Sequence, residues 1–274
     1  RMGKIMPREP DEVREVEVDG YKVVTYSYGE GDNVLFLLNG GPGLPCNYLR
    51  DPHISLVVEG YRVVAFDQLG CGRSDRPVDE SLWNIARYVE EVETVRQALE
   101  LNQIHLLGQS WGGWLGIEYA LTYPNAIRSL ILANTCGDLP HLTVELNRMR
   151  DALGSETVAM MLHHEATGTL DHPEYQAAVT ILNYRHVCRL KEWPESLYIG
   201  NLKEWNRIPD MHRLTMPTLI ITGTHDEIGP ACALKMHNVL PNSEVVVFPN
   251  SSHVPFYEEP DNYFDNLKNF LARQ

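Results

Sequence analysis

A serine flanked by glycines stands at the junction between a predicted strand and a predicted helix. The segment Gly108-Gln109-Ser110-Trp111-Gly112 follows the apolar run 104–107 and opens the helical pattern 111–123. A serine at such a sharp turn is held in a strained conformation that presents its hydroxyl, while the glycines let helix and strand approach closely. The segment predicts a nucleophilic serine at position 110. The alternative is a tight glycine-rich turn with an incidental serine.

A serine hydroxyl is a poor nucleophile unless a base and an orienting acid accompany it. In doubly wound sheets that carry this turn, the partners follow in the order Ser, Asp or Glu, His, on loops after later strands. Asp226 comes just after the predicted strand 218–222, and His253 comes after the predicted strand 244–248. Ligands bind at the carboxyl ends of such strands. We therefore expect His253 to be the base and Asp226 the acid, with Glu227 as the nearest substitute for the acid.

Acyl transfer also requires donors for the oxyanion, and two backbone N–H groups are predicted to supply them. One is the N–H of Trp111, the residue after the serine. The other comes from Gly40-Gly41-Pro42-Gly43, which follows the buried apolar run Val34–Leu38. Glycine lets the backbone turn an N–H toward a substrate without a Cβ in the way. Gly41 is the candidate.

Other glycine-rich and ligand-like patterns do not predict a cofactor. The segment 70–75, Gly-Cys-Gly-Arg-Ser-Asp, lacks the spacing and the following helix that a dinucleotide requires, and no P-loop is found. The histidines, cysteines and acids show no metal-ligand spacing. We expect neither a cofactor nor a metal ion.

These residues are positioned by alternating strands and helices, which predict a mostly parallel α/β sheet. Asp19-Gly20 joins two alternating runs and predicts a hairpin. Strands are expected at 13–18, 21–28, 34–38, 62–66, 104–107, 127–133, 218–222 and 244–248. Helices are expected at 84–101, 111–123, 144–153, 156–164, 174–190, 231–239 and 260–271. Because no strand pattern occurs in 137–214, we interpret that segment as a helical cap inserted between the core parts 1–136 and 215–274.

Composition excludes several classes of protein. The 274 residues are 43% hydrophobic and 22% charged, which is typical of a globular chain and not of a disordered one. No apolar run approaches the roughly 20 residues of a membrane span. The net charge of −14 argues against nucleic acid, whose binding requires a basic surface. We expect no membrane and no nucleic-acid partner.

The cysteines indicate a reducing compartment. Cys46, Cys71, Cys136, Cys188 and Cys232 are odd in number, lie far apart and include no CxxC pair. Such a set fits reduced thiols and not a disulfide framework. Together with the lack of an apolar leader segment, it leads us to expect a cytoplasmic protein.

The motifs together resemble those of a known family. They are Asn-Gly-Gly-Pro-Gly at 39–43, Asp-Gln-Leu-Gly-Cys-Gly-Arg-Ser at 67–74, Gly-Gln-Ser-Trp-Gly-Gly at 108–113, Gly-Thr-His-Asp at 223–226 and Ser252-His253. Over essentially its whole length the chain resembles the proline iminopeptidases of the α/β-hydrolase fold and the related L-amino-acid amidases. The resemblance implies a doubly wound sheet with a helical cap, the triad Ser110, Asp226 and His253, and oxyanion donors at Gly41 and Trp111.

The resemblance also implies glutamates that recognise the free amino group of the substrate. One directly follows the triad acid and corresponds to Glu227. The other lies in the cap before a Gly-x-Leu-Lys-Glu-Trp stretch, which begins here at Gly200, and corresponds to Glu195. A carboxylate facing an ammonium group forms a charge-assisted hydrogen bond. The alternative for both residues is a solvated surface charge.

The sequence departs from the family pattern at two places. The family's histidine at the start of the glycine-rich loop is Asn39 here, and the cap is shorter between Trp193-Pro194 and Gly200. Neither change removes a triad residue. A shorter cap would open the pocket to bulkier amides.

Three functions are consistent with these residues. The first is a serine hydrolase that cleaves the amide bond after a free N-terminal amino acid through an acyl-enzyme, with an amino-acid amide or short peptide as its small-molecule substrate. The second is a carboxylesterase or lactonase that uses the same triad on neutral acyl groups. The third is a non-enzymatic binding module. The sequence leaves open which amino acid is preferred and what the oligomeric state is.

Overall fold

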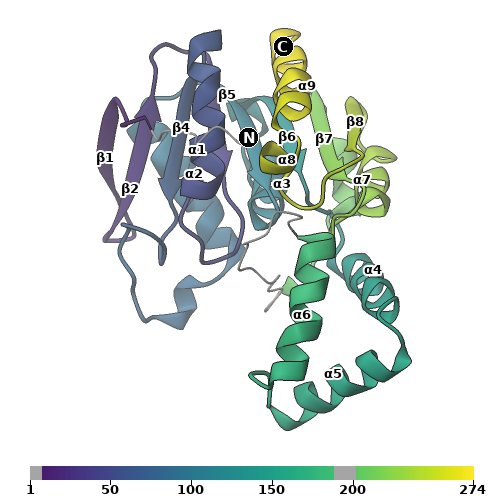
Figure 1. Cartoon of the computed structure of the whole chain (residues 1–274). Coiled ribbons are helices and arrows are strands. Elements are labelled where there is room, and N and C mark those ends of the chain that lie inside the picture. The colour runs from purple at the N-terminus through teal and green to yellow at the C-terminus, as the bar shows by residue number, and fades with distance from the viewer. Residues whose placement is uncertain (1–7, 188–201) are drawn as a thin grey trace.

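The centre of the molecule is one eight-stranded sheet, seen in a computed structural model that describes residues 8–187 and 202–274 (Figure 1). The strand order is β1-β2-β4-β3-β5-β6-β7-β8. β1 and β2 run antiparallel to their neighbours, whereas the strands from β4 to β8 are parallel. The predicted α/β-hydrolase type of sheet is therefore confirmed. The strands are β1 (Glu12–Val18), β2 (Tyr21–Tyr28), β3 (Val34–Leu38), β4 (Arg62–Asp67), β5 (Ile104–Gln109), β6 (Ile127–Ala133), β7 (Thr218–Gly223) and β8 (Ser243–Phe248).

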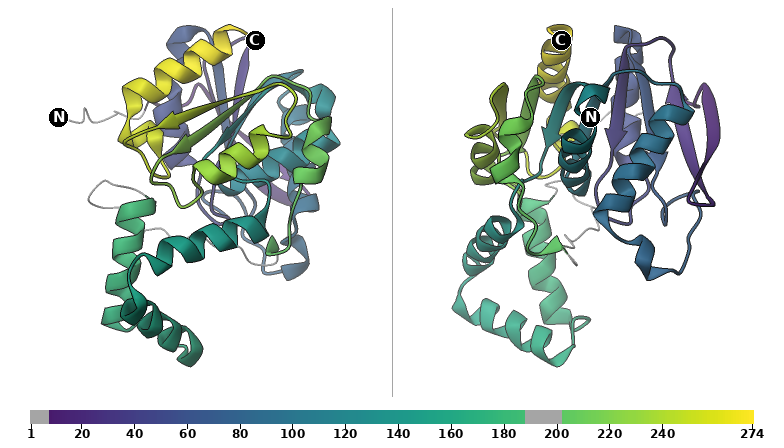
Figure 2. Two further views of the ribbon diagram at one scale, coloured as in Figure 1. Left: turned by 90° about the vertical axis from the view of Figure 1, so that its right-hand side faces the viewer. Right: turned by 180° about the vertical axis from the view of Figure 1, so that it is seen from behind.

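Helices cover both faces of this sheet (Figure 2). α2, α3 and α7 pack on one face, and α1, α8 and α9 pack on the other. These helices are α1 (Asn47–His53), α2 (Ile85–Ala98), α3 (Trp111–Thr122), α7 (Pro230–His237), α8 (Pro255–Glu258) and α9 (Pro260–Ala272). β3 shows why its sequence is apolar throughout. Phe36 and Leu38 point to the first face while Leu35 and Leu37 point to the second, since successive side chains of a strand alternate.

The hairpin expected at Asp19-Gly20 is present. Val18 pairs with Tyr21, and the two turn residues have φ values of 53° and 82°. Both angles lie in the left-handed region that this type of two-residue turn requires. The pairing fixes the register of β1 on β2 at the edge of the sheet.

Three further helices extend beyond the carboxyl edge of the sheet (Figure 1). They are α4 (Leu139–Asp151), α5 (Ser155–Thr167) and α6 (Pro173–His186). In the described residues between β6 and β7, no strand occurs apart from an isolated bridge between Asp138 and Asn206. None of the helices in the described part of the chain combines the length and the apolar character needed to cross a membrane.

Several helices differ from the sequence-based expectation, among them α4 and α1. α4 begins at Leu139, five residues before the predicted start, because the Asp138 side chain caps it by accepting a hydrogen bond from the His141 N–H at 3.0 Å. α1 was not predicted, since it is only seven residues long and contains Pro52. A short helix with an internal proline has a weak periodic signal and depends on its tertiary contacts.

α1 is joined to α9 by a buried histidine. The ring nitrogens of His53 lie 2.7 Å from the Leu49 carbonyl oxygen and 2.7 Å from the Tyr263 hydroxyl. The side chain is fully buried, and burial lowers the pKa of His53 to about 4, although the hydrogen bond to Leu49 opposes the shift. The folded protein therefore holds this histidine neutral.

We predict that His53 makes the fold sensitive to mild acid. In the unfolded chain its pKa is near 6.5, so the unfolded state binds the extra proton first and the free energy of unfolding falls as the pH drops from about 6.5 to 4, by at most about 3 kcal/mol. In His53→Gln, urea unfolding measured across this range should show a shallower fall. The exposed His212→Gln is the control and should keep the wild-type slope. Equal slopes in wild type and His53→Gln would contradict the assignment.

Candidate active site

Ser110 stands alone between β5 and α3, at the centre of the sheet's carboxyl edge. Its φ of 58° and ψ of −123° are a strained conformation for a residue with a side chain. Three backbone contacts maintain it. The Ser110 N–H donates to the Ala133 carbonyl at 3.0 Å, and the Ser110 carbonyl accepts from the Gly113 N–H and the Thr135 hydroxyl, both at 2.8 Å.

The glycines around Ser110 are required by close packing. A Cβ on Gly112 would lie 2.0 Å from the Leu38 carbonyl oxygen, and a Cβ on Gly108 would lie 2.2 Å from the Gly112 carbonyl oxygen. No real Cβ contact is that short. The sharp turn from strand to helix is thus possible only because both positions lack a side chain, as the sequence motif predicts.

The structure brings together the residues predicted to be the base and the acid. His253 Nδ1 lies 2.8 Å from Asp226 Oδ1, and both side chains are buried. Since a carboxylate accepts the Nδ1 proton, the proton-accepting role falls to Nε2 of the ring. Burial raises the pKa of Asp226, while the adjacent His253 and the hydrogen bonds to the carboxylate oppose that shift.

Two further donors hold the Asp226 carboxylate in place. The Ile228 N–H donates to Oδ1 at 3.0 Å, and the Asn134 amide donates to Oδ2 at 2.8 Å. The same Asn134 amide nitrogen lies 3.1 Å from the Ser252 carbonyl, so it links the loop after β7 to the loop after β8. Asn134 itself has a φ of 52°, which asparagine tolerates better than most residues with a side chain.

The loop that carries His253 is fixed by a glutamate at the end of α8. The Glu258 carboxylate accepts the backbone N–H groups of Ser252 and Val254, at 2.9–3.0 Å. These are the residues on either side of His253. The Glu258 side chain therefore sets the direction of the backbone that presents the imidazole.

A chain of hydrogen bonds connects His253 to the glycine-rich loop. The Gln109 amide donates to the His253 carbonyl at 3.0 Å, and the Gln109 side-chain oxygen accepts the Tyr48 hydroxyl proton at 2.5 Å. The Tyr48 oxygen in turn accepts the Gly40 N–H at 2.6 Å. The predicted base and the predicted oxyanion loop are therefore positioned by one continuous set of polar contacts.

The glycine-rich loop passes directly beside the serine. A Cβ on Gly40 would lie 3.0 Å from Ser110 Cβ, and Gly41 has a φ of 123° that favours glycine. Asn39 braces the loop by donating to the carbonyls of Gly40 and Leu44, at 3.0 and 2.9 Å. Asn39 thus supports the loop at the position where the family has histidine.

The predicted oxyanion donor Trp111 is tied to the same region through its side chain. Its indole N–H donates to the Gln68 side-chain oxygen at 3.0 Å, and the Gln68 amide lies 3.3 Å from the Asn39 carbonyl. Gln68 therefore connects Trp111 to the glycine-rich loop by hydrogen bonds.

The two predicted amine-binding residues have different outcomes. Glu227 is half-buried directly after Asp226, and its backbone N–H donates to the His186 carbonyl at 2.9 Å. Glu195, like Trp193, Pro194 and Gly200, lies outside the described residues, so its role remains a prediction.

The end of α6 docks onto the loops that carry Asp226 and His253. The His253 N–H donates to the Val187 carbonyl at 2.8 Å, and the Ser252 hydroxyl donates to the Arg185 carbonyl at 3.1 Å. Nδ1 of His186 lies 2.8 Å from the His225 carbonyl. Carbonyls in the last turn of a helix have no intrahelical partner, and here the loops after β7 and β8 supply their donors.

Comparison with known proteins agrees with this geometry. The family profile of the alpha/beta hydrolase fold matches residues 33–161. The proline iminopeptidase of Heyndrickxia coagulans is 32% identical over 93% of this chain and 97% of its own. The chain belongs to the proline iminopeptidase family. It is therefore a hydrolase of the α/β type, and the family resemblance read from its motifs is confirmed.

Solved structures are similar over nearly the whole length. The crystal structure of VinJ matches with a TM-score of 0.91 and 30% identity, covering 96% of this chain and 99% of that one. The proline iminopeptidase of Mycobacterium smegmatis matches with a TM-score of 0.87 and 28% identity, covering 96% and 98%. The enzyme thus shares its architecture with both proteins, one of which is a proline iminopeptidase.

Several residues of the site were not predicted from the sequence. Asn134 could have been found, because it directly follows β6 at the same edge of the sheet as Asp226 and His253. Tyr48, Gln109 and Glu258 act through contacts that no local pattern signals. They are positioning residues, since their contacts are with the elements that carry the candidate catalytic groups.

We predict that Tyr48→Phe impairs catalysis more than folding. The substitution removes one oxygen and with it the acceptor of the Gly40 N–H beside Ser110 and the donor to Gln109. We expect kcat to fall about 10-fold while KM changes less than about twofold, measured on any chromogenic substrate that the enzyme cleaves. Tyr123→Phe is the matched control, since its hydroxyl contacts Glu90 at the surface. Equal kinetics in the two variants would contradict this role.

Proposed function

We propose that this enzyme cleaves the amide bond after a free N-terminal amino acid, as a proline iminopeptidase-like aminopeptidase or an L-amino-acid amidase. The observation that carries the proposal is the position of Glu227, half-buried and directly after an Asp226 that already binds His253. A carboxylate at that place is suited to the ammonium group of an amino acid whose carbonyl lies at Ser110. The substrate is a small molecule, either an amino-acid amide or a short peptide.

The proposed reaction uses Ser110, His253 and Asp226 as a triad. His253 Nε2 takes the proton of the Ser110 hydroxyl as the oxygen attacks the substrate carbonyl carbon, and the N–H groups of Gly41 and Trp111 stabilise the resulting oxyanion. His253 then gives that proton to the amide nitrogen, the C–N bond breaks, and the amine leaves. Water attacks the acyl-enzyme with His253 again as the base, which releases the amino acid and restores Ser110.

The proposal also assigns a role to the helical segment between β6 and β7. We assign residues 137–214 to a cap over the site, between the core parts 1–136 and 215–274. Within this cap, Glu195 is proposed to hold the substrate ammonium together with Glu227. The contacts of Arg185, His186 and Val187 with the loops after β7 and β8 support a cap that borders the amine-binding side.

We predict that Ser110→Ala abolishes hydrolysis and covalent labelling. A fluorophosphonate probe should label the wild type once, at Ser110, and should fail to label the variant, while kcat should fall on the order of 10⁴-fold or more. Thr135→Ser, which keeps a hydroxyl near the Ser110 carbonyl, is the control and should label normally. A wild-type protein that resists the probe and cleaves no ester or amide would favour a binding module.

We predict that the enzyme discriminates for a free amino group. The kcat/KM for an amino-acid arylamide should greatly exceed that for its N-acetyl counterpart, with proline and phenylalanine tested side by side. Glu227→Gln removes the charge at nearly constant size, and we expect it to lower the free-amine kcat/KM about 10- to 100-fold with little effect on the acetylated substrate.

The same experiment tests the alternative function. Equal or faster turnover of the N-acetyl substrate, unchanged in Glu227→Gln, would exclude amine recognition and place the enzyme among carboxylesterases or lactonases that use the same triad. The ratio of the proline to the phenylalanine substrate would define the preferred amino acid.

A further inference from the structure

A large cavity opens on the side of Ser110 that is remote from Glu227. Its volume is about 590 Å³, and it is lined by segments that follow β3 and β4, by the start of α2 and by the first turn of α3. In the sheet, β3 and β4 lie on one side of β5, whereas β7 and β8, which precede Asp226 and His253, lie on the other. Ser110, at the end of β5, therefore stands between the cavity and the acidic side of the site.

The cavity begins at the predicted oxyanion loop. Pro42 and Gly43 line it, and so does Trp111, whose backbone N–H is the second proposed oxyanion donor. A substrate carbonyl held at these donors would thus have the cavity immediately beside it. Glu227 and His253 would lie on its opposite side.

The walls are aromatic and apolar. The Trp111 ring meets the Tyr88 ring edge to face, with centroids 5.6 Å apart, and Trp83 stacks on Tyr88 at 6.3 Å. Burial raises the pKa of the Cys71 thiol in this wall to about 11, so the thiol is neutral at physiological pH. Such a surface gains free energy by covering an apolar group, and aromatic rings add specific stacking contacts.

The charge of the cavity restricts what can enter. Among the lining residues in the described part of the chain, none carries a positive charge, and Glu80 supplies a negative one. A free carboxylate at the end of a dipeptide would therefore meet no cationic partner among these described lining residues. A neutral amide, an arylamine or a longer peptide avoids that cost.

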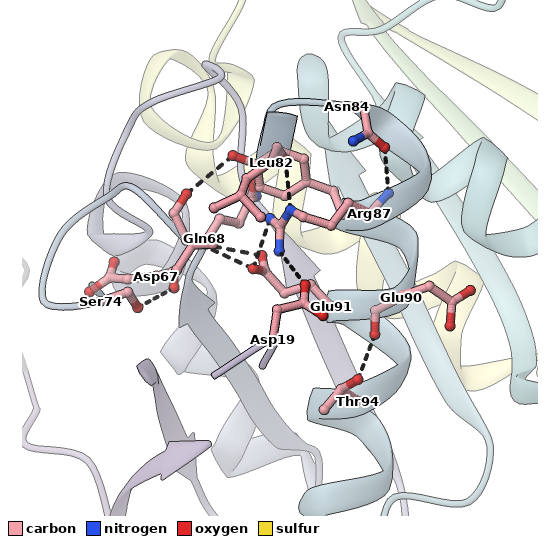
Figure 3. Close-up of polar contacts among 12 residues, drawn as sticks. Asp19, Asp67, Gln68, Ser74, Leu82, Asn84, Arg87, Glu90, Glu91 and Thr94 are labelled. Carbon is pink, nitrogen blue, oxygen red and sulfur yellow. Dashed lines mark hydrogen bonds and ion pairs between the residues drawn. The ribbon is translucent and has the colours of Figure 1, made fainter. Parts of the chain in front are cut away.

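The wall that carries Trp83 is held in place by a buried ion pair (Figure 3). Arg87 donates to the Leu82 carbonyl at 2.7 Å and to the Glu91 carboxylate at 3.1 Å. The Glu91 oxygens also accept the Leu69 N–H at 3.3 Å. One arginine thus ties the segment before Trp83 to the loop after β4, so that two walls of the cavity have a fixed separation.

The Trp83 ring also needs a glycine beneath it. A Cβ on Gly70 would lie 2.9 Å from Trp83 Cη2, and Gly70 has a φ of 91°. The absence of a side chain at Gly70 allows the indole to close over the loop. The position of the Trp83 ring therefore depends both on Gly70 and on the contacts of Arg87.

We propose that this cavity is the leaving-group subsite, which makes the enzyme selective for amides whose amine carries an aromatic or bulky apolar group and no free carboxylate. The inference rests on the proposed function, because it takes Glu227 as the residue that fixes the amino end. With that end on the β7 side, the substituent on the amide nitrogen can extend to the other side of the carbonyl and enter the cavity. The nitrogen itself stays within reach of His253, which protonates it as the C–N bond breaks.

The test compares substrates in which the same type of bond, a peptide bond, is cleaved and only the leaving group differs. Substrates share one free L-amino acid as the acyl group and differ in the second residue, which is phenylalanine amide, glycine amide or phenylalanine with a free carboxylate. We expect kcat/KM for phenylalanine amide to exceed that for glycine amide by about 10-fold or more. The free carboxylate should lower kcat/KM relative to phenylalanine amide.

Variants of the wall assign this preference to the cavity. Trp83→Ala should reduce the preference for phenylalanine over glycine to less than about threefold, and Trp83→Phe should retain most of it. If Trp83→Ala does not fold, Ile85→Trp, which narrows the same cavity, should lower turnover of the phenylalanine amide and spare the glycine amide. The ratio between two different acyl groups on one leaving group is the control, and it should stay unchanged.

Two kinds of failure are distinguishable. Equal kcat/KM for phenylalanine and glycine amides, or a preference that survives in a folded Trp83→Ala, would overturn the leaving-group subsite and leave the proposed function intact. Cleavage of none of the free-amine substrates, or equal cleavage of their N-acetyl forms, would overturn the proposed function and the subsite with it.

Discussion

The close approach of three backbone segments at Ser110 is the constraint on which the site depends. The helix that follows the serine enters so near the end of β3 that a Cβ on Gly112 would lie 2.0 Å from the Leu38 carbonyl oxygen. Because this contact is between backbone atoms, no side-chain rearrangement can relieve it. It fixes the first residues of the glycine-rich loop relative to the serine. The proposed oxyanion loop and the proposed nucleophile Ser110 are thus parts of one rigid unit, which is the preorganisation that charge stabilisation in acyl transfer requires.

The proposed base, His253, is connected to this unit through contacts between residues far apart in the sequence. Gln109 bonds to His253, which lies 144 positions later in the chain, and Tyr48 bonds to Gln109, 61 positions later. Asn134 bonds to Asp226, 92 positions later. All three side chains are hydrogen-bonded in or beside a buried site, although among the described residues the Oδ1 atom of Asn134 has no partner. Removing one partner of these bonds would leave a further buried polar atom unpaired, which costs more than the bond contributes. The network therefore specifies one arrangement of the loops after β3, β5, β6, β7 and β8.

These separations explain what the sequence could predict and what it could not. Ser110, Asp226 and His253 are marked by local patterns, because each follows a strand and the edge of a parallel sheet brings such positions together. The sheet was predictable for the same reason, since runs such as Val34–Leu38 have a periodicity that depends on neighbours in the sequence. No local sequence pattern identifies Tyr48. It lies on α1, a short helix that exists through its tertiary contacts, and its partners are chosen by the fold. The docking of Val187 on His253 likewise depends on the path of the helical segment and not on any motif.

The end of α6 and the loop that carries His253 consequently stabilise each other. The last turn of α6 has carbonyls without intrahelical partners, and the loop at Ser252 and His253 has donors that need acceptors. The carbonyls and the donors pair with one another, so displacing the end of α6 would leave unpaired polar groups on both the helix and the loop. The end of α6 at residues 185–187 is therefore held against the loop that carries His253.

The side of the site next to the cavity is held in position by a buried ion pair. Burial raises the pKa of Glu91 to about 7, while the charge of Arg87 and the Leu69 N–H oppose the shift. Burying an ion pair contributes little net stability, because the desolvation of both groups offsets their attraction. Its effect here is geometric, since Arg87 and Glu91 together hold the Leu82 carbonyl and the Leu69 N–H at set positions. An apolar pair of similar size would fill the same space but could not bind both backbone groups. The ion pair is therefore better explained by the shape of the neighbouring cavity than by the stability of the fold.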